Sequence, residues 1–141
     1  MNIYFACSIT GGREFETIYQ EIVAALTIDG HEIPTSHLVR SDVQENERAL
    51  TPQQVYERDV NWIKNCDALI AEVSTPSHGV GYEIGYALNI GKPVLCIHDA
   101  KQKVSKMITG NSDPALSLKA YSHSEEAILL VRAFINTLNY L

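Results

Sequence analysis

Short runs of β-prone apolar residues alternate with segments of helical periodicity along the whole chain, and this alternation limits the fold more than any other feature. A chain of this kind forms a parallel sheet whose strands are connected by helices, so helices cover both faces. The run 68–73 is apolar except at Glu72, as expected for a strand buried from both sides. The five runs cover residues 3–7, 31–35, 68–73, 93–97 and 116–121. We predict an α/β fold, a flavodoxin-like or Rossmann-like doubly wound sheet of five parallel strands with helices on both faces.

The helices are predicted between and after these strands. Thr51 suits an N-cap and Pro52 suits the first helical position, so one helix is expected to begin there. Residues 36–50, in contrast, are polar and lack a clear period, which predicts a long loop of the kind that often binds or covers a ligand. The other helices are predicted at about 13–28, 80–91, 104–108 and 125–138. Residues 1–141 contain no linker or internal repeat and are predicted to form a single domain.

The composition narrows the class of partner. A net charge of −6 over 141 residues argues against a nucleic-acid polymer, because binding a phosphate backbone needs a surplus of Lys and Arg. Cys7, Cys66 and Cys96 lack metal-like spacing and fit reduced thiols in a reducing compartment. No apolar run approaches the roughly 20 residues that span a bilayer, so we expect a cytoplasmic protein without a membrane partner. A small anionic ligand is still compatible with this chain, because a few local donors can hold one phosphate.

The loop 8–12, Ser-Ile-Thr-Gly-Gly, lies between the first predicted strand and its helix. Its backbone N–H groups, together with the helix dipole, could bind an anion. The loop matches neither the Walker pattern nor the dinucleotide-binding glycine fingerprint, which disfavours ATP and NAD. A tight turn that needs Gly11 and Gly12 only for its backbone explains the loop equally well.

Two carboxylates flank the predicted ligand edge of the sheet. Gly79 and Gly81 precede Glu83 near the start of a helix, where a sugar could approach and the helix dipole would keep the carboxylate ionised. Asp59 lies on the preceding helix next to Val60, which looks like a core residue. Paired carboxylates beside a sugar are the groups that cleave glycosidic bonds, one as nucleophile and one as acid. The alternative is that Glu83 merely favours a helix N-terminus.

Three blocks are distinctive when taken together: 4–13 (YFACSITGGR), 57–62 (ERDVNW) and 67–85, with a weaker fourth at 104–108. They resemble the 2′-deoxynucleoside 5′-monophosphate N-hydrolase family (the Rcl type), a branch of the nucleoside 2-deoxyribosyltransferase superfamily. The resemblance runs from the first strand to about Tyr121, and the third block is its most specific part.

The resemblance implies roles for individual residues. Glu83 would be the nucleophile, Asp59 would protonate the departing base, and Tyr4 would lie beside the sugar and hold Glu83. Ser77 would bind the 5′-phosphate. Ser105 of a neighbouring subunit would reach the same phosphate, and Met107 of that subunit would help to wall the pocket, so the protein would be a homodimer with a shared active site. Further substrate contacts are predicted at Ser8, Ile9, Gly11, Gly12, Arg13, His37, Gly79 and Gly81, with His37 near the base unless it is an ordinary loop histidine. The family uses no metal and no cofactor.

The implied activity is hydrolysis of the N-glycosidic bond of 2′-deoxynucleoside 5′-monophosphates to free base and deoxyribose 5-phosphate, through a covalent glycosyl-enzyme intermediate. The chain departs from the family pattern at Cys7, where Gly is common, and at Thr10, where a basic residue is common. Without that cation the expected preference for nucleotides over nucleosides is weaker. Three alternatives stay open: a deoxyribosyltransferase that passes the sugar to a second base, a ribonucleotide N-glycosidase of the same superfamily, and a non-catalytic nucleotide-binding domain.

Overall fold

A computed structural model describes residues 1–138, apart from the side chain of Asn46, so the last three residues of the predicted domain lie outside the described part. Its centre is a parallel sheet of four strands in the order β1-β2-β3-β4. The register places Tyr4 of β1 opposite Leu69 of β2, and Ala71 of β2 opposite Cys96 of β3. The strands are β1 (Ile3–Ala6), β2 (Ala68–Glu72), β3 (Val94–Asp99) and β4 (Leu116–Tyr121).

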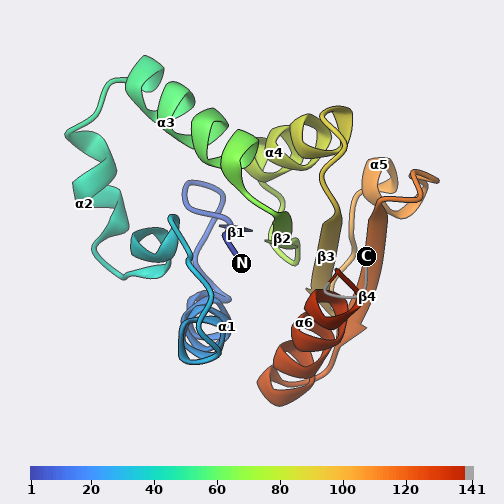
Figure 1. Ribbon diagram of the computed structural model, residues 1–141. Helices are drawn as coiled ribbons and strands as arrows, with labels where there is room; N and C mark the ends of the chain where they lie inside the picture. The colour runs from blue at the N-terminus through green and yellow to red at the C-terminus, as the bar shows by residue number, and fades with distance from the viewer. Residues whose placement is uncertain (139–141) are drawn as a thin grey trace.

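Helices cover both faces of this sheet, as predicted (Figure 1). They are α1 (Glu16–Ile28), η1 (Ser36–Val39, a 3-10 helix), α2 (Val43–Arg48), α3 (Pro52–Asn65), α4 (His78–Asn89), α5 (Lys106–Thr109) and α6 (Ser124–Leu138). Because side chains alternate along a strand, Ile3 and Phe5 of β1 pack with α1 and α6, whereas Tyr4 and Ala6 pack with α3 and α4. No helix within residues 1–138 combines the length and apolar character needed to cross a bilayer.

The prediction of a second strand at 31–35 is wrong, so the sheet has four strands and not five: only a single bridge, between Asn2 and Glu32, forms there. The Glu32 N–H donates to the Met1 carbonyl at 2.9 Å, and the Ile3 N–H donates to the Glu32 carbonyl at 2.8 Å. The next donor in a parallel ladder would be residue 34, which is Pro34 and has no N–H. The ladder therefore stops, and the Phe5 N–H donates instead to the Thr35 hydroxyl at 3.1 Å. The segment still lies at the β1 edge, as the second strand of a flavodoxin-like sheet would.

The prediction of an irregular loop at 36–50 is also wrong, since this segment contains η1 and α2. Both helices are too short to show a helical period in the sequence. Tertiary packing holds them, because Leu38, Val39 and Val43 are buried. The helix predicted to begin at Thr51 is confirmed, and Thr51 forms a reciprocal capping box with Gln54.

The loops after β1 and β2 touch each other at the carboxyl edge of the sheet. A Cβ atom at Gly11 would lie 2.4 Å from the Pro76 carbonyl oxygen and 2.9 Å from the Ser8 Oγ, so only glycine fits this approach. Gly12 has a φ of +132°, a backbone conformation that side-chain-bearing residues rarely adopt. The two glycines therefore have structural reasons to be there, whether or not they also contact a ligand.

We expect Gly11→Ala to lower the free energy of unfolding by about 1–3 kcal/mol, because the added methyl group forces the two loops apart. Urea denaturation measures the change. Thr10→Ala, an exposed position in the same loop, serves as the control and should leave stability nearly unchanged. Equal stability of the Gly11→Ala variant and the wild type would show that the loops do not touch as described.

Candidate active site

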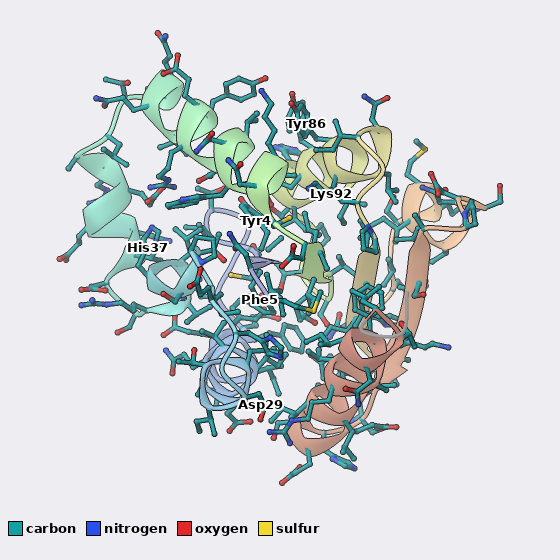
Figure 2. All side chains as sticks on the ribbon, in the orientation of Figure 1. Tyr4, Phe5, Asp29, His37, Tyr86 and Lys92 are labelled. Atoms are coloured by element: carbon teal, nitrogen blue, oxygen red, sulfur yellow. The ribbon has the colours of Figure 1, made fainter. Side chains whose placement is uncertain are left out.

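Glu83 lies on α4 with its carboxylate directed at β1. The Tyr4 hydroxyl donates to Glu83 Oε1 at 2.7 Å across 79 residues of sequence. Figure 2 shows Tyr4 near the centre of the molecule, in the layer between the sheet and helices α3 and α4. Because Tyr4 is itself fully buried, the phenol fixes the position of Oε1 and leaves Oε2 outside this hydrogen bond.

The prediction that the helix dipole keeps Glu83 ionised is wrong. Ser77 is the N-cap of α4, so Glu83 stands in the second turn and the first turn carries no acidic residue. The pKa of Glu83 is raised to about 7: burial is the largest cause and the charge of Asp59 adds to it, whereas the Tyr4 hydrogen bond and the charge of Arg58 lower it. Gly81 and Gly85 are exposed, and a Cβ atom added at either would meet nothing within 4 Å, so the burial of Glu83 does not come from these two glycines.

Asp59 on α3 shares a cavity of about 480 Å³ with Glu83. Burial also raises the pKa of Asp59 above its usual value, although the hydrogen bond and charge of Arg58 lower it. The structure thus brings together the three residues predicted to be catalytic, Glu83, Asp59 and Tyr4. Two carboxyls with raised pKa values at one cavity can hold a single proton between them, which suits acid and nucleophile roles.

Ser77 borders this cavity and also a second one of about 550 Å³. Its hydroxyl caps α4 by accepting from the Val80 N–H at 3.3 Å, so hydroxyl and helix dipole converge there. Gly79 lines the first cavity, whereas Gly81, Ser105 and Met107 line the second. Met107 is 84% exposed and Ser105 caps α5, so within one chain neither reaches the Glu83 cavity.

The first loop divides into residues that face the cavity and residues that build the scaffold. Ile9 lines the cavity, and Ser8 is fully buried with an Oγ that meets no hydrogen-bond partner in the described part of the chain. Arg13 points elsewhere: its guanidinium donates to Glu16 and to the carbonyls of Ser8, Leu38 and Arg40 at 2.9–3.2 Å. This arginine therefore ties η1 to the β1 loop, and its predicted substrate contact stays a prediction.

His37 does not line the cavity as the structure stands. Its Nε2 lies 3.7 Å from Glu47 Oε1, and its ring packs edge-on to Trp62 at 5.7 Å between centroids. Figure 2 places it toward the edge of the molecule, beside the short helices that follow α1. It touches the site through Glu47, and a direct contact with a base stays a prediction.

Sequence reasoning missed the wall of the cavity formed by α2, α3 and the residues between them. Its members are Glu47, Leu50, Pro52, Val55 and Tyr56. Val55 and Tyr56 precede Asp59 by four and three residues, so helical spacing alone could have placed them on its face. Glu47 could not be found in this way, because α2 has no recognisable period. Within residues 1–138, His, Cys, Asp and Glu side chains form no group that could hold a metal ion.

Comparisons with known proteins agree on one family. The family model described as nucleoside 2-deoxyribosyltransferase matches residues 3–127. A Methanococcoides burtonii protein provisionally assigned as a 2′-deoxynucleoside 5′-phosphate N-hydrolase is 40% identical over 121 residues, which is 86% of this chain and 99% of that protein. The 5-hydroxymethyl-dUMP N-hydrolase of Rattus norvegicus is 36% identical over 138 residues, covering 94% of this chain and 84% of that protein.

The fold is also similar to a solved structure. The CMP N-glycosidase of Clostridium botulinum matches with a TM-score of 0.70 and covers 94% of this chain and 99% of the other. The sequence identity is 21%, so this likeness supports the α/β architecture alone.

The raised pKa of Glu83 predicts a dependence of stability on pH. A carboxyl whose pKa rises from 4.5 unfolded to about 7 folded favours folding while protonated, and this contribution is lost as pH rises through about 7. Glu83→Gln lacks the ionisation, so above pH 7 we expect it to be more stable than the wild type by up to about 3 kcal/mol, and below pH 4 to be nearly equal.

Urea denaturation at pH 4 and pH 8 measures this difference. Glu21→Gln, on the exposed side of α1, changes the net charge equally and is the matched control. If the stability difference between Glu83→Gln and the wild type is the same at both pH values, the raised pKa of Glu83 is contradicted.

Proposed function

The chain belongs to the nucleoside 2-deoxyribosyltransferase family, and we propose from this premise that it is an N-glycosidase that hydrolyses 2′-deoxynucleoside 5′-monophosphates to free base and deoxyribose 5-phosphate. Membership confirms the family that the three sequence blocks predicted. Relatives at 36–40% identity bear N-hydrolase names, which favours water over a second base as the acceptor.

One observation carries the proposal: a desolvated carboxylate, held by Tyr4 at one oxygen, shares a cavity with a second carboxyl of raised pKa. A binding domain gains nothing from burying two acidic groups beside a ligand, because each costs desolvation free energy. A glycosidase needs both, one to attack the anomeric carbon and one to supply a proton.

In the first step Glu83 Oε2 attacks C1′ of the sugar, and a C1′–O bond forms as the C1′–N bond breaks. The electron pair of the broken bond goes to the base nitrogen, with the proton delivered by Asp59. In the second step the Asp59 carboxylate takes a proton from water, whose oxygen attacks C1′. The C1′–O bond to Glu83 breaks as the bond to the water oxygen forms, its electron pair returns to Glu83, and the Tyr4 hydroxyl stabilises the carboxylate that departs.

The 5′-phosphate is assigned to the N-terminus of α4. Ser77 and the backbone N–H groups that follow it offer donors, and the helix dipole favours an anion there. With the phosphate there, the base would lie against the apolar wall at Leu50 and Val55, and Asp59 would lie beside the bond between sugar and base.

We further propose a homodimer with a shared active site. The second cavity beside Ser77 is lined by apolar Val80 and Ile84 and by the exposed Met107, a surface that a second copy could cover. Ser105 and Met107 of one subunit would then complete the phosphate end of the other. Three buried free thiols fit a reducing compartment, and a cytoplasmic location is part of the proposal.

Product analysis tests the reaction. With a panel of deoxynucleoside 5′-monophosphates we expect free base and deoxyribose 5-phosphate, and no new nucleoside when a second base is added.

Glu83→Gln should lower kcat by several decades, each decade being about 1.4 kcal/mol of transition-state stabilisation, while substrate binding persists. Activity of Glu83→Gln within about tenfold of wild type would contradict the assignment of Glu83 as the nucleophile.

Ser77→Ala tests the phosphate assignment. Loss of a charge-assisted hydrogen bond of about 1.5–3 kcal/mol should raise KM for the nucleotide tenfold or more. The same change should barely alter the weak cleavage of the matching nucleoside, which lacks the phosphate. Steady-state kinetics on one nucleotide and its nucleoside give the comparison. Equal effects on both substrates would place the phosphate elsewhere.

A further inference from the structure

Arg58 lies between two carboxylates that both line the active-site cavity. Its Nη1 and Nη2 donate to Glu47 Oε1 and Oε2 at 2.8 and 3.0 Å, and its Nε donates to Asp59 Oδ1 at 2.8 Å. The two-pronged pair with Glu47 fixes the plane of the guanidinium, which a single contact could not do. The orientation of Nε toward Asp59 is therefore set by a residue of α2.

Other groups keep this arrangement in place. The guanidinium carbon lies 4.9 Å from the centroid of the Trp62 ring, so the indole packs against one face. The side chains of Arg58, Glu47 and Asp59 are each exposed by 20% or less, so water competes weakly for their hydrogen bonds. Gln44 of α2 donates to the Ile9 carbonyl at 3.4 Å, which connects α2 with the loop after β1.

Resting on the proposed function, we propose that Glu47 and Arg58 are positioning residues for the general acid: Arg58 holds Asp59 Oδ1 so that Oδ2 carries the proton to the departing base. In the described part of the chain no hydrogen bond reaches Oδ2. Glu47 occupies the other edge of the guanidinium and so keeps Arg58 from gripping both oxygens of Asp59. Segment 36–50 thereby takes part in catalysis although none of its residues reacts.

The charges around Asp59 give Glu47 a second effect. The hydrogen bond and charge of Arg58 lower the pKa of Asp59, whereas the negative charge of Glu47 raises it, and His37 of η1 lowers it slightly. Tyr4 of β1 and Glu83 of α4 face the same carboxyl from the sheet and from the neighbouring helix. Glu47 therefore offsets the charge of Arg58, which by itself would lower the pKa of Asp59 and favour loss of its proton.

Two substitutions should move the pH profile in opposite directions. Glu47→Gln leaves Arg58 uncompensated, so the basic limb of kcat should move to lower pH. Arg58→Gln leaves Glu47 uncompensated, so the same limb should move to higher pH. Arg58→Lys keeps the charge but cannot bond both carboxylates in this geometry, so it should not restore the rate. A residue that only supports the fold would not produce opposite shifts.

The experiment compares two substrates across these variants. One is a natural deoxynucleotide, and the other is a deoxyribose 5-phosphate glycoside of a nitrophenol, whose leaving group needs no proton. For Glu47→Gln and Arg58→Lys at pH 8 we expect kcat on the natural substrate to fall tenfold or more, within the ~10²–10⁴-fold that general acids supply. Release of nitrophenol in the first turnover, which needs no acid and precedes the hydrolysis of the ester, should stay within about threefold of wild type, which also shows that the variants fold. Glu45→Gln, an exposed glutamate on the same helix, is the matched control.

Asp59→Asn separates this inference from the proposed function. If Asp59→Asn slows the natural substrate selectively and Glu47→Gln behaves like Glu45→Gln, the positioning role is overturned while the acid assignment stands. If Asp59→Asn slows the first turnover of both substrates equally, or the wild type cleaves no nucleotide, the proposed function itself fails; the first turnover is the readout because the later hydrolysis of the ester also uses Asp59. The positioning role is supported if Asp59→Asn, Glu47→Gln and Arg58→Lys each slow the natural substrate selectively. It also requires that the basic limb of the pH profile of kcat move in opposite directions for Glu47→Gln and Arg58→Gln.

Discussion

The parallel pairing of β1 with β2 is the constraint on which the site depends. It places the ends of two strands side by side, so the loop after β1 meets the loop after β2 at Gly11 and Pro76. The strand alternation then turns Tyr4 toward α3 and α4, where its hydroxyl meets Glu83. A one-residue slip of β1 would turn Tyr4 to the opposite face and leave the Glu83 carboxylate without its donor.

A second glutamate shows that environment, and not residue type, decides the role of a buried carboxylate. Glu72 at the end of β2 is fully buried and accepts from the Ser74 N–H, the Ser74 hydroxyl and the Tyr121 hydroxyl. Burial raises its pKa, but these donors act against the shift. The Asp99 N–H also donates to Ser74, so the network joins the ends of three strands and steadies the loop that leads to Ser77. Within the described residues Glu83 accepts a hydrogen bond only from Tyr4, and it faces a cavity, which suits the nucleophile role proposed for it.

The sequence was informative where a signal repeats over many residues or is held by one strong local rule. Helical and strand periods predicted the sheet and its covering helices, and Thr51 with Pro52 marked the start of α3. The errors arose where one atom or a tertiary contact decides: the missing N–H of Pro34 ends a strand, and buried Val43 holds a helix too short to show a period. The motif blocks predicted that Asp59 and Glu83 lie at one site, and both line the same cavity, whereas the pairing of Glu47 with Arg58 depends on a contact between helices that no spacing reveals.

The distribution of cations has a consequence for how an acidic chain holds an anionic substrate. No Lys or Arg is among the described residues that line the Glu83 cavity, and Arg13 and Arg58 spend their donors on backbone carbonyls and carboxylates. On the proposed assignment the phosphate is bound by hydroxyl and backbone N–H groups at the start of α4, where the helix dipole provides partial positive charge. Lys103 lines only the second cavity, beyond Ser77. Neutral donors bind phosphate less strongly than a guanidinium, but they add no second cation beside Asp59, whose pKa Arg58 already lowers.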